Sequence, residues 1–244
     1  MRVSVGKWTK HKLMLENERL ASFLPDTQYL NRTSLNTMLD KYNQIMVKPC
    51  NGFQGRGIIQ ISSLSNEQFV LHIERSETLI NGKENIYDYL KENHFPRNRH
   101  RYIVQQRIPL ATINNNPFDV RVMVQRKKDS LEWAVTGKLA RVAANNFIVT
   151  NAAKAILSVE NAIEISLVNN ENIKDIVTDL EEVSLLIAGQ LANSYTKKRV
   201  YGIDLGIDTE GKVWIIEANL TPAVSMFKLL NDGSYETIKS YKRG

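Results

Sequence analysis

The chain has 244 residues, of which 43% are hydrophobic and 24% charged, with a formal net charge of +6. These values are typical of a soluble globular protein that folds as one large domain or two closely packed lobes. A single cysteine, Cys50, excludes an intramolecular disulfide framework, and no stretch reaches the roughly 18 to 20 apolar residues that span a bilayer. The single cysteine fits a reducing cytoplasm, and the lack of a spanning stretch predicts no membrane partner. Basic residues are spread out except at 96–101 and 125–128, so we expect no nucleic-acid partner.

The first part of the chain predicts a helix and a glycine-rich hairpin. Residues 7–24 place apolar side chains at helical spacing and run into Pro25, which predicts one helix that ends there. Two short β-type runs, IMVKP at 45–49 and GIIQI at 57–61, flank a polar stretch rich in glycine. The pattern predicts two strands joined by a glycine-rich loop.

The middle of the chain predicts strands with one helix among them. FVLHI at 69–73 is typical of a strand, and residues 85–91 of a helix. RYIVQQRIPL at 101–110 predicts a strand that ends in a proline loop. Residues 119–127 and 131–143 then predict a hairpin that turns at 128–130.

The C-terminal part predicts a long helix, a second strand pair and a short terminal helix with a frayed end. Because strands come as hairpins with helices between the groups, we expect an α+β protein with antiparallel sheets. The clearest helix is residues 173–194, whose apolar stripe consists of Ile176, Leu180, Val183, Ile187 and Leu191.

The strongest chemical signal lies in GIDLGIDTEGKVWIIEANLTP, residues 202–222. Asp204 sits in one apolar run, and Glu217 and Asn219 sit in the next, with turn residues between them. In a hairpin these oxygen ligands lie in adjacent strands, and Glu217 and Asn219 project from one face. Such a set, without Cys or His, suits Mg²⁺, with Mn²⁺ as an alternative, bound together with substrate phosphates. Ordinary strand carboxylates are the alternative interpretation, but apolar surroundings make them costly unless they are paired or bound to metal.

The glycine-rich loop in VKPCNGFQGRGI, residues 47–58, is a second candidate element. Lys48, at the end of the preceding strand, can place a point charge on a phosphate. No Gly-Lys-Ser/Thr sequence closes the loop, so it is not a Walker loop. It predicts a flap over a nucleotide, with a purely structural turn as the alternative. The glycines that can bring backbone N–H groups close to an anion are Gly52, Gly55 and Gly57.

A third element is the cationic set Arg121, Lys138 and Arg141. Arg121 lies in DVRVMV and Arg141 in KLARVA. If these strands pair, their cationic side chains can hold a triphosphate or a carboxylate. Surface arginines on a sheet face are the alternative.

These pieces occur in an order that resembles the ATP-grasp superfamily over nearly the whole chain, from Lys7 to about Lys228. KW near the start, VTGKLARVA and GKVWIIEAN are most similar to the branch of endospore coat-associated ATP-grasp proteins. The resemblance implies an α+β ATP-grasp fold of two lobes with mainly antiparallel sheets and the nucleotide between them. We expect an N-terminal lobe at 1–108, which carries the flap, and a C-terminal lobe at 109–244, which carries the metal ligands.

The resemblance also implies contacts with ATP. Lys7 matches the family's early phosphate lysine better than Lys10 or Lys12 does, and Lys48 matches the second one. Asp204, Glu217 and Asn219 match the metal ligands. RYIVQQRI matches the segment that lines the adenine, where backbone groups near residues 106–108 would bind the adenine edge. The expected nucleotide-binding residues are Lys7, Lys48, Gly52, Gly55, Gly57, Gln105, Gln106, Arg107, Ile108 and Lys138.

The sequence departs from the family pattern in three places. Gln105 and Gln106 stand where many relatives have a Glu that contacts the ribose. After Asn151, itself a weak phosphate candidate, the chain reads AAKAI instead of a glycine pair. The family's usual leading domain is also absent, so we expect a partner chain to supply it or the protein to be minimal.

The resemblance implies an ATP- and Mg²⁺-dependent ligase that joins a carboxylate to an amine, such as a peptide, through an acylphosphate. Lys48, Arg121 and Arg141 are the expected catalytic residues. The alternatives are a nucleotide-binding or structural spore-coat protein with degenerate catalysis, and a kinase-like transfer. The sequence does not identify the acceptor substrate, the donor substrate or the oligomeric state.

Overall fold

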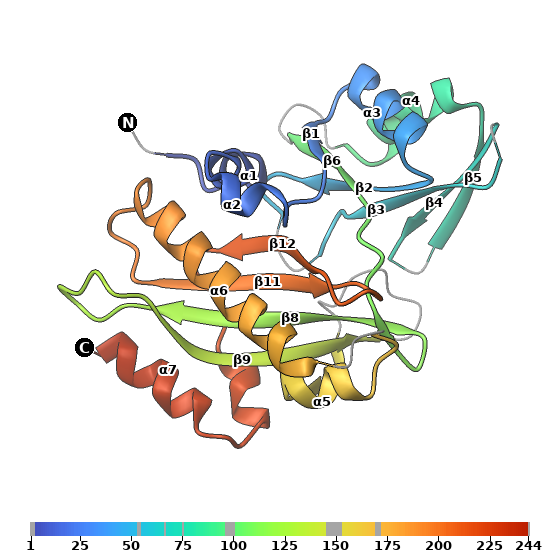
Figure 1. The fold of residues 1–244 in the computed structure, drawn as a ribbon. Coiled ribbons are helices and arrows are strands. Elements are labelled where there is room, and N and C mark those ends of the chain that lie inside the picture. Colours follow the sequence, from blue (N-terminus) through green and yellow to red (C-terminus); the bar gives the residue numbers. More distant parts are fainter. Residues whose placement is uncertain are drawn as a thin grey trace.

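Two antiparallel sheets form the framework of the computed structural model, which describes residues 3–52, 55–65, 67–74, 76–95, 101–144, 153–168 and 172–243. Figure 1 shows the smaller unit, with α3 and α4, above the larger unit that carries the long helix α6. Every strand pair is antiparallel, so the expected α+β class is confirmed.

The smaller sheet has the strand order β1-β6-β2-β3-β4-β5. Strands β2 and β3 pair on either side of the glycine-rich stretch, as predicted, and β6 is the strand expected at RYIVQQ. Helices α3 and α4 cover one face around a core that includes Leu35 and Leu90. The elements are β1 (Thr27–Tyr29), α3 (Arg32–Lys41), β2 (Gln44–Pro49), β3 (Ile59–Ser63), β4 (Gln68–Ile73), β5 (Ser76–Asn81), α4 (Lys83–Asn93) and β6 (Tyr102–Gln106).

The larger sheet has the order β10-β9-β8-β11-β12, with the short β7 paired to β8. Both predicted hairpins are present, since β8 pairs with β9 and β11 with β12. The strands are β7 (Thr112–Ile113), β8 (Asn116–Gln125), β9 (Ala134–Ala143), β10 (Ala153–Leu157), β11 (Val200–Ile207) and β12 (Val213–Asn219).

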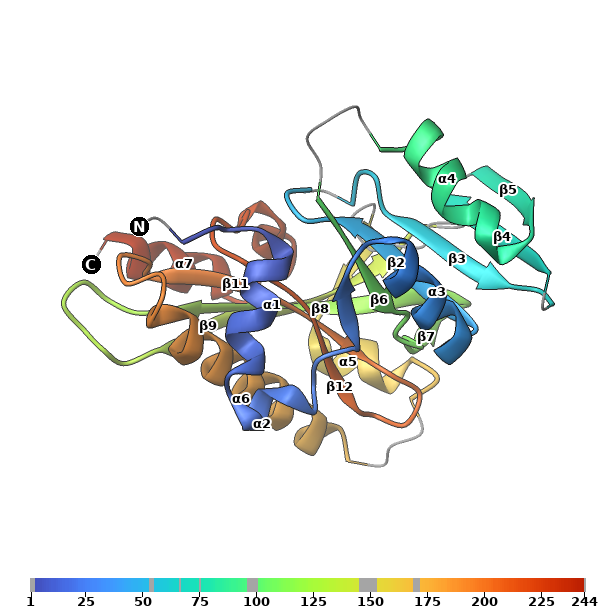
Figure 2. The same cartoon turned by 90° about the horizontal axis from the view of Figure 1, so that it is seen from above.

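Helices cover the two faces of the larger sheet unequally, as Figures 1 and 2 show together. The long helix α6 lies along one face with α5, α1 and α2, and all five residues of its predicted stripe are buried. The opposite face is covered by η1 and α7 over one end only, around Phe227 and Ile238. The helices are α1 (Lys7–Leu15), α2 (Glu18–Ala21), α5 (Val159–Glu164), α6 (Ile173–Ala192), η1 (Ser225–Leu229) and α7 (Ser234–Arg243).

The alternation of side chains along β8 explains how this sheet serves both a core and a site. Val120, Val122 and Val124 point into the core under α6. Asp119 and Arg121 point to the other face, where neither η1 nor α7 covers them, and Met123 lies on that face beneath η1 and α7. One end of the second face is therefore left for polar side chains.

The predicted single helix at residues 7–24 is wrong in detail, because the chain forms two helices there. Helix α1 ends at Leu15, and Asn17 starts α2 by accepting a hydrogen bond from the Arg19 N–H at 3.1 Å. An Asn side chain competes with the helical backbone for such donors, so it favours a cap over a helix interior. The break lets Leu20 and Leu24 turn into the core of the larger sheet.

Helix α3 has no counterpart among the sequence predictions, although it carries a capping signal. The Asn31 side chain accepts from the Ser34 N–H at 2.8 Å, and Ser34 Oγ accepts from the Asn31 N–H at 2.9 Å. This is a capping box with Ser in place of the usual Glu or Gln at its second position.

The first two helices lie with the larger sheet although they precede the smaller one in sequence. Helix α1 packs on α6, and Met14 joins the larger core. The division at residues 108 and 109 stays a prediction; by packing, the smaller unit extends from about residue 27 to residue 106.

Candidate functional site

Two connected cavities occupy the cleft between the sheets. They share Lys7, Ile58, Arg141, Asp204 and Glu217, so the acidic side chains stand at the junction. The first cavity extends along β6 and the segment that follows it, and its walls include Met46 and Leu110. The second extends beneath the glycine-rich loop towards the segment before η1.

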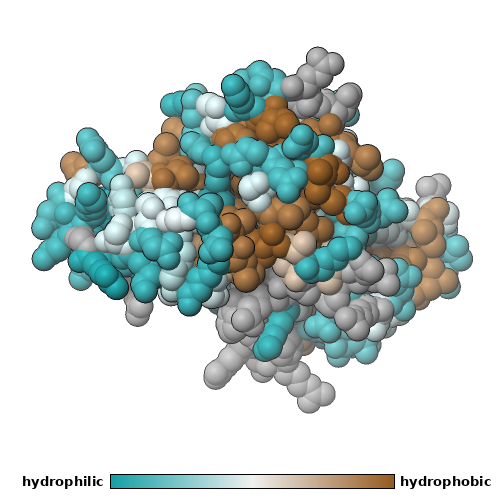
Figure 3. All heavy atoms as spheres, turned by 90° about the horizontal axis from the view of Figure 1, so that it is seen from below, coloured by the Kyte–Doolittle hydropathy of each residue, from teal (hydrophilic) through white to brown (hydrophobic). Residues whose placement is uncertain are grey.

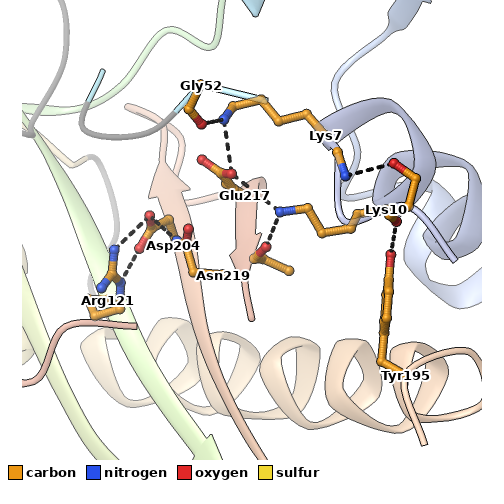
Figure 4. Close-up of polar contacts among 11 residues, drawn as sticks. Lys7, Lys10, Gly52, Arg121, Tyr195, Asp204, Glu217 and Asn219 are labelled. Atoms are coloured by element: carbon orange, nitrogen blue, oxygen red, sulfur yellow. Dashed lines mark hydrogen bonds and ion pairs between the residues drawn. The ribbon is translucent and has the colours of Figure 1, made fainter. Parts of the chain in front are cut away.

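The predicted metal ligands come together across the β11–β12 pair. Asp204 and Glu217 are direct partners in the register, and Asn219 Nδ2 donates to Asp204 Oδ2 at 3.0 Å. Figure 4 shows Glu217 and Asn219 on one strand with Asp204 on the next. Carboxylate oxygens of both strands therefore face the same cleft.

A β-bulge at Ile216 makes this arrangement possible. Leu205 pairs with Ile215 although Asp204 pairs with Glu217, so Ile216 is the extra residue of β12. Strict alternation would put Ile215 and Glu217 on one face. The bulge instead sends Ile215 into the core and leaves Glu217 in the cleft, as bulges near sites commonly do.

Asp204 is buried within a network of two arginines. Arg121 forms a fork on its two carboxylate oxygens, with Nη2 to Oδ2 at 2.9 Å, and Arg141 Nη2 lies 3.2 Å from Oδ1. Burial acts to raise the pKa of Asp204, but the charges of Arg141 and Arg121 outweigh it and hold that pKa below its ordinary value. Asp204 is therefore ionised throughout the physiological range.

Asp119 completes the network and holds Arg141 in place. Arg141 donates to both oxygens of Asp119, at 2.7 and 2.5 Å. Bidentate pairing fixes the plane of the guanidinium group, which leaves one edge for Asp204 and the cleft. Asp119 is not among the residues predicted from the sequence, although the spacing Asp-x-Arg puts it on the same strand face as Arg121.

Glu217 is bound by two lysines of α1. Lys7 Nζ donates to Glu217 Oε1 at 3.0 Å, and Lys10 Nζ lies 3.4 Å from the same oxygen while donating to the Ala218 carbonyl. Figure 4 shows both ammonium groups converging on this carboxylate. Lys12, the third candidate, is exposed on α1. The structure therefore singles out Lys7 and Lys10 and not Lys12.

The two lysines hold the position in which a cation would bind Glu217, so they are expected to compete with a metal ion. Lys10→Met removes one competing charge and should raise the Mn²⁺ affinity of the nucleotide-free protein by about tenfold, a coupling of about 1.4 kcal/mol. Titration of Mn²⁺ followed by electron paramagnetic resonance measures this affinity. Lys12→Met is the matched control, and an equal rise in both variants would contradict the competition.

Lys48 is a buried cation near the end of β2, opposite Ile103 of β6. Its Nζ donates to Gln105 Oε1 at 2.6 Å, and Gln105 Nε2 donates to Thr27 Oγ1 at 2.8 Å. Burial and the nearby Lys7 charge lower the pKa of Lys48 to about 8, although Glu217 opposes the shift. An anion in the cleft would restore the charged form.

Nucleotide affinity is therefore expected to fall as the pH rises through about 8. A lowered pKa means that the free protein loses the Lys48 proton above that pH, so binding of an anion must then take a proton up. Isothermal titration of ADP in buffers of different ionisation enthalpy should show uptake that approaches one proton near pH 9. Lys48→Arg should remove the uptake, and uptake that persists in that variant would refute the assignment.

The segment expected to line the adenine borders the first cavity. Two of its backbone N–H groups already donate hydrogen bonds within the protein. The N–H groups of Gln106 and Arg107 already donate to the Asp26 and Gln44 carbonyls, at 2.9 and 3.2 Å. Within the described ranges, the Ile108 N–H has no such partner. The expected N–H donor to the adenine edge thus narrows to Ile108. The Arg107 side chain is held by Gln60 and Gln44.

The glycines of the loop have distinct roles. Gly55 and Gly57 have φ angles of 69° and 72°, which other residues adopt only with strain. Gly52 is needed for space, because a Cβ there would lie 2.5 Å from a side-chain carbon of Pro49. Its carbonyl accepts a hydrogen bond from Lys7 Nζ at 2.8 Å, so the loop presents an oxygen to this lysine.

Lys138 does not join the other cations. Its Nζ lies 2.7 Å from Glu181 and 3.2 Å from Glu160, on the α5 and α6 side of the sheet. Arg141 is three residues away along β9, and an odd spacing places two strand residues on opposite faces. The expectation that Lys138 shares a site with Arg121 and Arg141 is therefore corrected.

Two further expectations concern residues beside the site. Asp208 shapes the β11–β12 turn by accepting from the Glu210 and Lys212 N–H groups, each at 3.0 Å, as expected of a turn residue. Asn151 lies outside the described residues. Among the described residues, no group of three or more His, Cys, Asp and Glu side chains is arranged to hold a metal ion. No described helix is long and apolar enough to cross a membrane.

The fold is shared with solved ATP-grasp enzymes. The C-terminal domain of Pby1 from K. lactis, an ATP-grasp enzyme, matches with a TM-score of 0.54 and 15% identity over 94% of this chain and 67% of its own. D-cycloserine synthetase matches with a TM-score of 0.56 and 9% identity over 98% of this chain and 70% of its own. The protein therefore has the ATP-grasp fold.

Residues 2–243 match the model of the YheC/D-like ATP-grasp family, and the chain belongs to that family. The endospore coat-associated protein YheD of Bacillus subtilis is 26% identical over 91% of this chain and 49% of its own length. Endospore coat-associated protein YheC of the same organism is 20% identical over 88% of this chain and 59% of its own. The chain thus spans about half the length of these relatives.

Proposed function

We propose that the protein is an ATP-dependent ligase that joins a carboxylate to an amine through an acylphosphate. The observation that carries this proposal is the junction of two cavities at Asp204 and Glu217, with Lys7 and Arg141 on its walls. A ligase of this kind needs a nucleotide and a second substrate on either side of the γ-phosphate. The two cavities provide one compartment for each.

The donor set fits Mg²⁺ that is completed by nucleotide phosphates. Asp204, Glu217 and Asn219 offer hard oxygen atoms on one face, but two carboxylates are few for a metal site made of protein alone. The two carboxylates form ion pairs with four cations, Lys7, Lys10, Arg121 and Arg141. The bound ion would neutralise charge on the phosphate oxygens.

The proposed reaction relies on positioning and charge, without a side-chain nucleophile. Lys48 and Lys7 bind the phosphates, and the Ile108 N–H binds the adenine edge. The substrate carboxylate attacks the γ-phosphorus, ADP leaves, and the amine then displaces phosphate from the acylphosphate. Arg141, fixed by Asp119, stabilises charge on the transferring group, and Arg121 orients Asp204.

Phosphate release tests the proposal. The protein is incubated with Mg-ATP and a panel of amino acids and short peptides, singly and in pairs, and products are identified by mass spectrometry. A ligase releases phosphate only with both an acid and an amine present, and the product mass equals their sum minus water. Transfer of phosphate to a hydroxyl, with a stable phosphorylated product, would indicate a kinase-like reaction instead.

A second candidate is a nucleotide-binding or structural protein of the spore coat. The observation that favours it is the closed network around Asp204, in which Arg121, Arg141 and Asn219 already occupy its oxygens. The names of the two Bacillus subtilis relatives agree with a location at the endospore coat. Tight ADP binding without phosphate release for any substrate pair would favour this candidate.

A further inference from the structure

Cationic side chains gather at one end of the larger sheet. The β8–β9 loop, the α6–β11 loop and the last turns of α7 meet there, as Figures 1 and 2 both show at the left. These segments contribute nine cationic side chains and two carboxylates, those of Asp129 and Glu132. Their local net charge of +7 exceeds the net charge of +6 of the whole chain. The cations are Arg126, Lys127, Lys128, Lys197, Lys198, Arg199, Lys239, Lys242 and Arg243. We call this group the basic end.

Hydrogen bonds and ring contacts hold the three segments together. The Arg126 N–H donates to the Arg199 carbonyl at 3.0 Å, which joins the two loops. Gln125 Nε2 donates to the Ile238 carbonyl at 3.2 Å, and Lys127 Nζ lies 5.5 Å from the centre of the Tyr241 ring, which joins α7 to the first loop. The charges therefore form one surface.

These cations lack carboxylate partners among the residues that the structure describes. Arg126 donates to backbone carbonyls and lies over the Trp133 ring, with 4.9 Å to its centre. Lys198 Nζ donates to the Leu220 carbonyl at 2.9 Å, and one guanidinium nitrogen of Arg199 is buried. The cations exposed at the surface are Lys127, Lys128, Lys197, Lys239, Lys242 and Arg243. Elsewhere, cations such as Lys83 and Arg32 pair with carboxylates. An unpaired, self-repelling cluster favours an anionic partner.

An exposed apolar residue in the β8–β9 loop, Leu131, favours one kind of anionic partner over another. Leu131 follows Lys127 and Lys128 in the same loop and is 85% exposed, more than any other large apolar side chain of the described chain. Figure 3 shows the surrounding end of the molecule covered mainly with hydrophilic side chains. An isolated Leu among lysines gains nothing from a phosphodiester backbone, but it can enter the acyl boundary of a bilayer while the lysines meet headgroups.

We propose that the basic end attaches the protein to the surface of an anionic phospholipid bilayer. Leu131 inserts at the headgroup boundary, Lys127 and Lys128 contact lipid phosphates, and the cationic end of α7 adds to the attraction. Arg126 lies five residues along β8 from Arg121, roughly 17 Å from the cleft. Attachment through Lys127, Lys128 and Leu131, which lie beyond Arg126 in the same loop, therefore leaves the cleft accessible. The sequence predicts no membrane partner, because no stretch of it is long and apolar enough to span a bilayer; attachment to the surface does not need such a stretch.

Co-sedimentation of the full chain with vesicles tests this attachment. Vesicles of phosphatidylglycerol and phosphatidylcholine in equal parts should bind the protein, and pure phosphatidylcholine should not. Raising the salt from about 0.05 to about 0.5 M should reduce binding at least tenfold, because screening shortens the reach of the charges. Inorganic phosphate at equal phosphorus concentration should not compete.

Variants distinguish a specific role of the basic end from the effect of the protein's overall charge. Lys127→Glu with Lys128→Glu should lower vesicle affinity at least tenfold, whereas Lys91→Glu with Lys174→Glu, the same change on exposed lysines elsewhere, should have less than a threefold effect. Leu131→Ser should lower affinity about threefold to tenfold. Thermal unfolding and nucleotide binding should be unchanged in all three. Equal losses in both lysine pairs, or a single-stranded oligonucleotide that binds more tightly than vesicles and depends on Lys127 and Lys128, would overturn the proposal.

Discussion

Replacing Glu217 by Gln is expected to lower ATP turnover by about a hundredfold or more while the fold stays intact. The amide keeps an oxygen that can accept from Lys7, but it lacks the charge that a divalent ion and its phosphates require. Unfolding free energy should fall by no more than about 2 kcal/mol, because the Glu217 side chain remains 22% exposed. Phosphate release with Mg-ATP and urea unfolding measure the two effects.

The control for this variant is Glu210→Gln, the same chemical change in the exposed turn of the same hairpin. It should leave both turnover and stability within measurement error. Undiminished turnover in the Glu217 variant would remove this carboxylate from the metal site. A Glu217 variant that unfolds at the temperature of assay would show a structural role instead.

Replacing Arg141 by Leu is expected to cause the largest loss of stability, about 3 to 5 kcal/mol of unfolding free energy. Asp119 and Asp204 are both buried, and this substitution removes the guanidinium group that lies against both. Burial of a carboxylate without its partner carries the full desolvation cost. Urea unfolding at neutral pH measures the loss.

The pH dependence of this loss follows from the lowered pKa of Asp204. A carboxylate whose pKa is lower in the folded state stabilises the protein above its unfolded pKa, near 4, and the contribution disappears as the pH falls through the folded value. The difference between wild type and the Arg141 variant should therefore shrink below about pH 4. A difference that does not change with pH would contradict the role of the ion pairs.

Lys138→Leu is the matched control, because Lys138 lies on the same strand but on the opposite face. Its partners Glu181 and Glu160 are 38% and 52% exposed, so its loss should cost less than about 1 kcal/mol. Combining Arg141→Leu with Asp119→Leu should recover part of the stability, since one of the stranded carboxylates is then gone. Equal losses for the Lys138 and Arg141 variants would show that burial of the network has no special energetic effect.

Local patterns predicted much of the fold because helices and hairpins depend on neighbours in sequence. The stripe from Ile176 to Leu191 identified the long helix, and the turn residues near Gly211 identified the β11–β12 hairpin. The spacing of Glu217 and Asn219 placed both on one strand face, which the structure confirms. The odd spacing between Lys138 and Arg141 also indicates opposite strand faces. The prediction placed both in one cationic set because of their charge alone.

The sequence by itself determined most of the order of the elements, the candidate acidic ligands and the family pattern, because these depend on residues close together in the chain. Only the tertiary structure decided which charges meet. Lys7 contacts Glu217 across 210 positions, and Arg121 contacts Asp204 across 83. The bulge at Ile216 and the gathering of cations at the basic end likewise depend on strand register and loop packing. Register is set by long-range pairing over the whole sheet. A local sequence pattern therefore does not predict it.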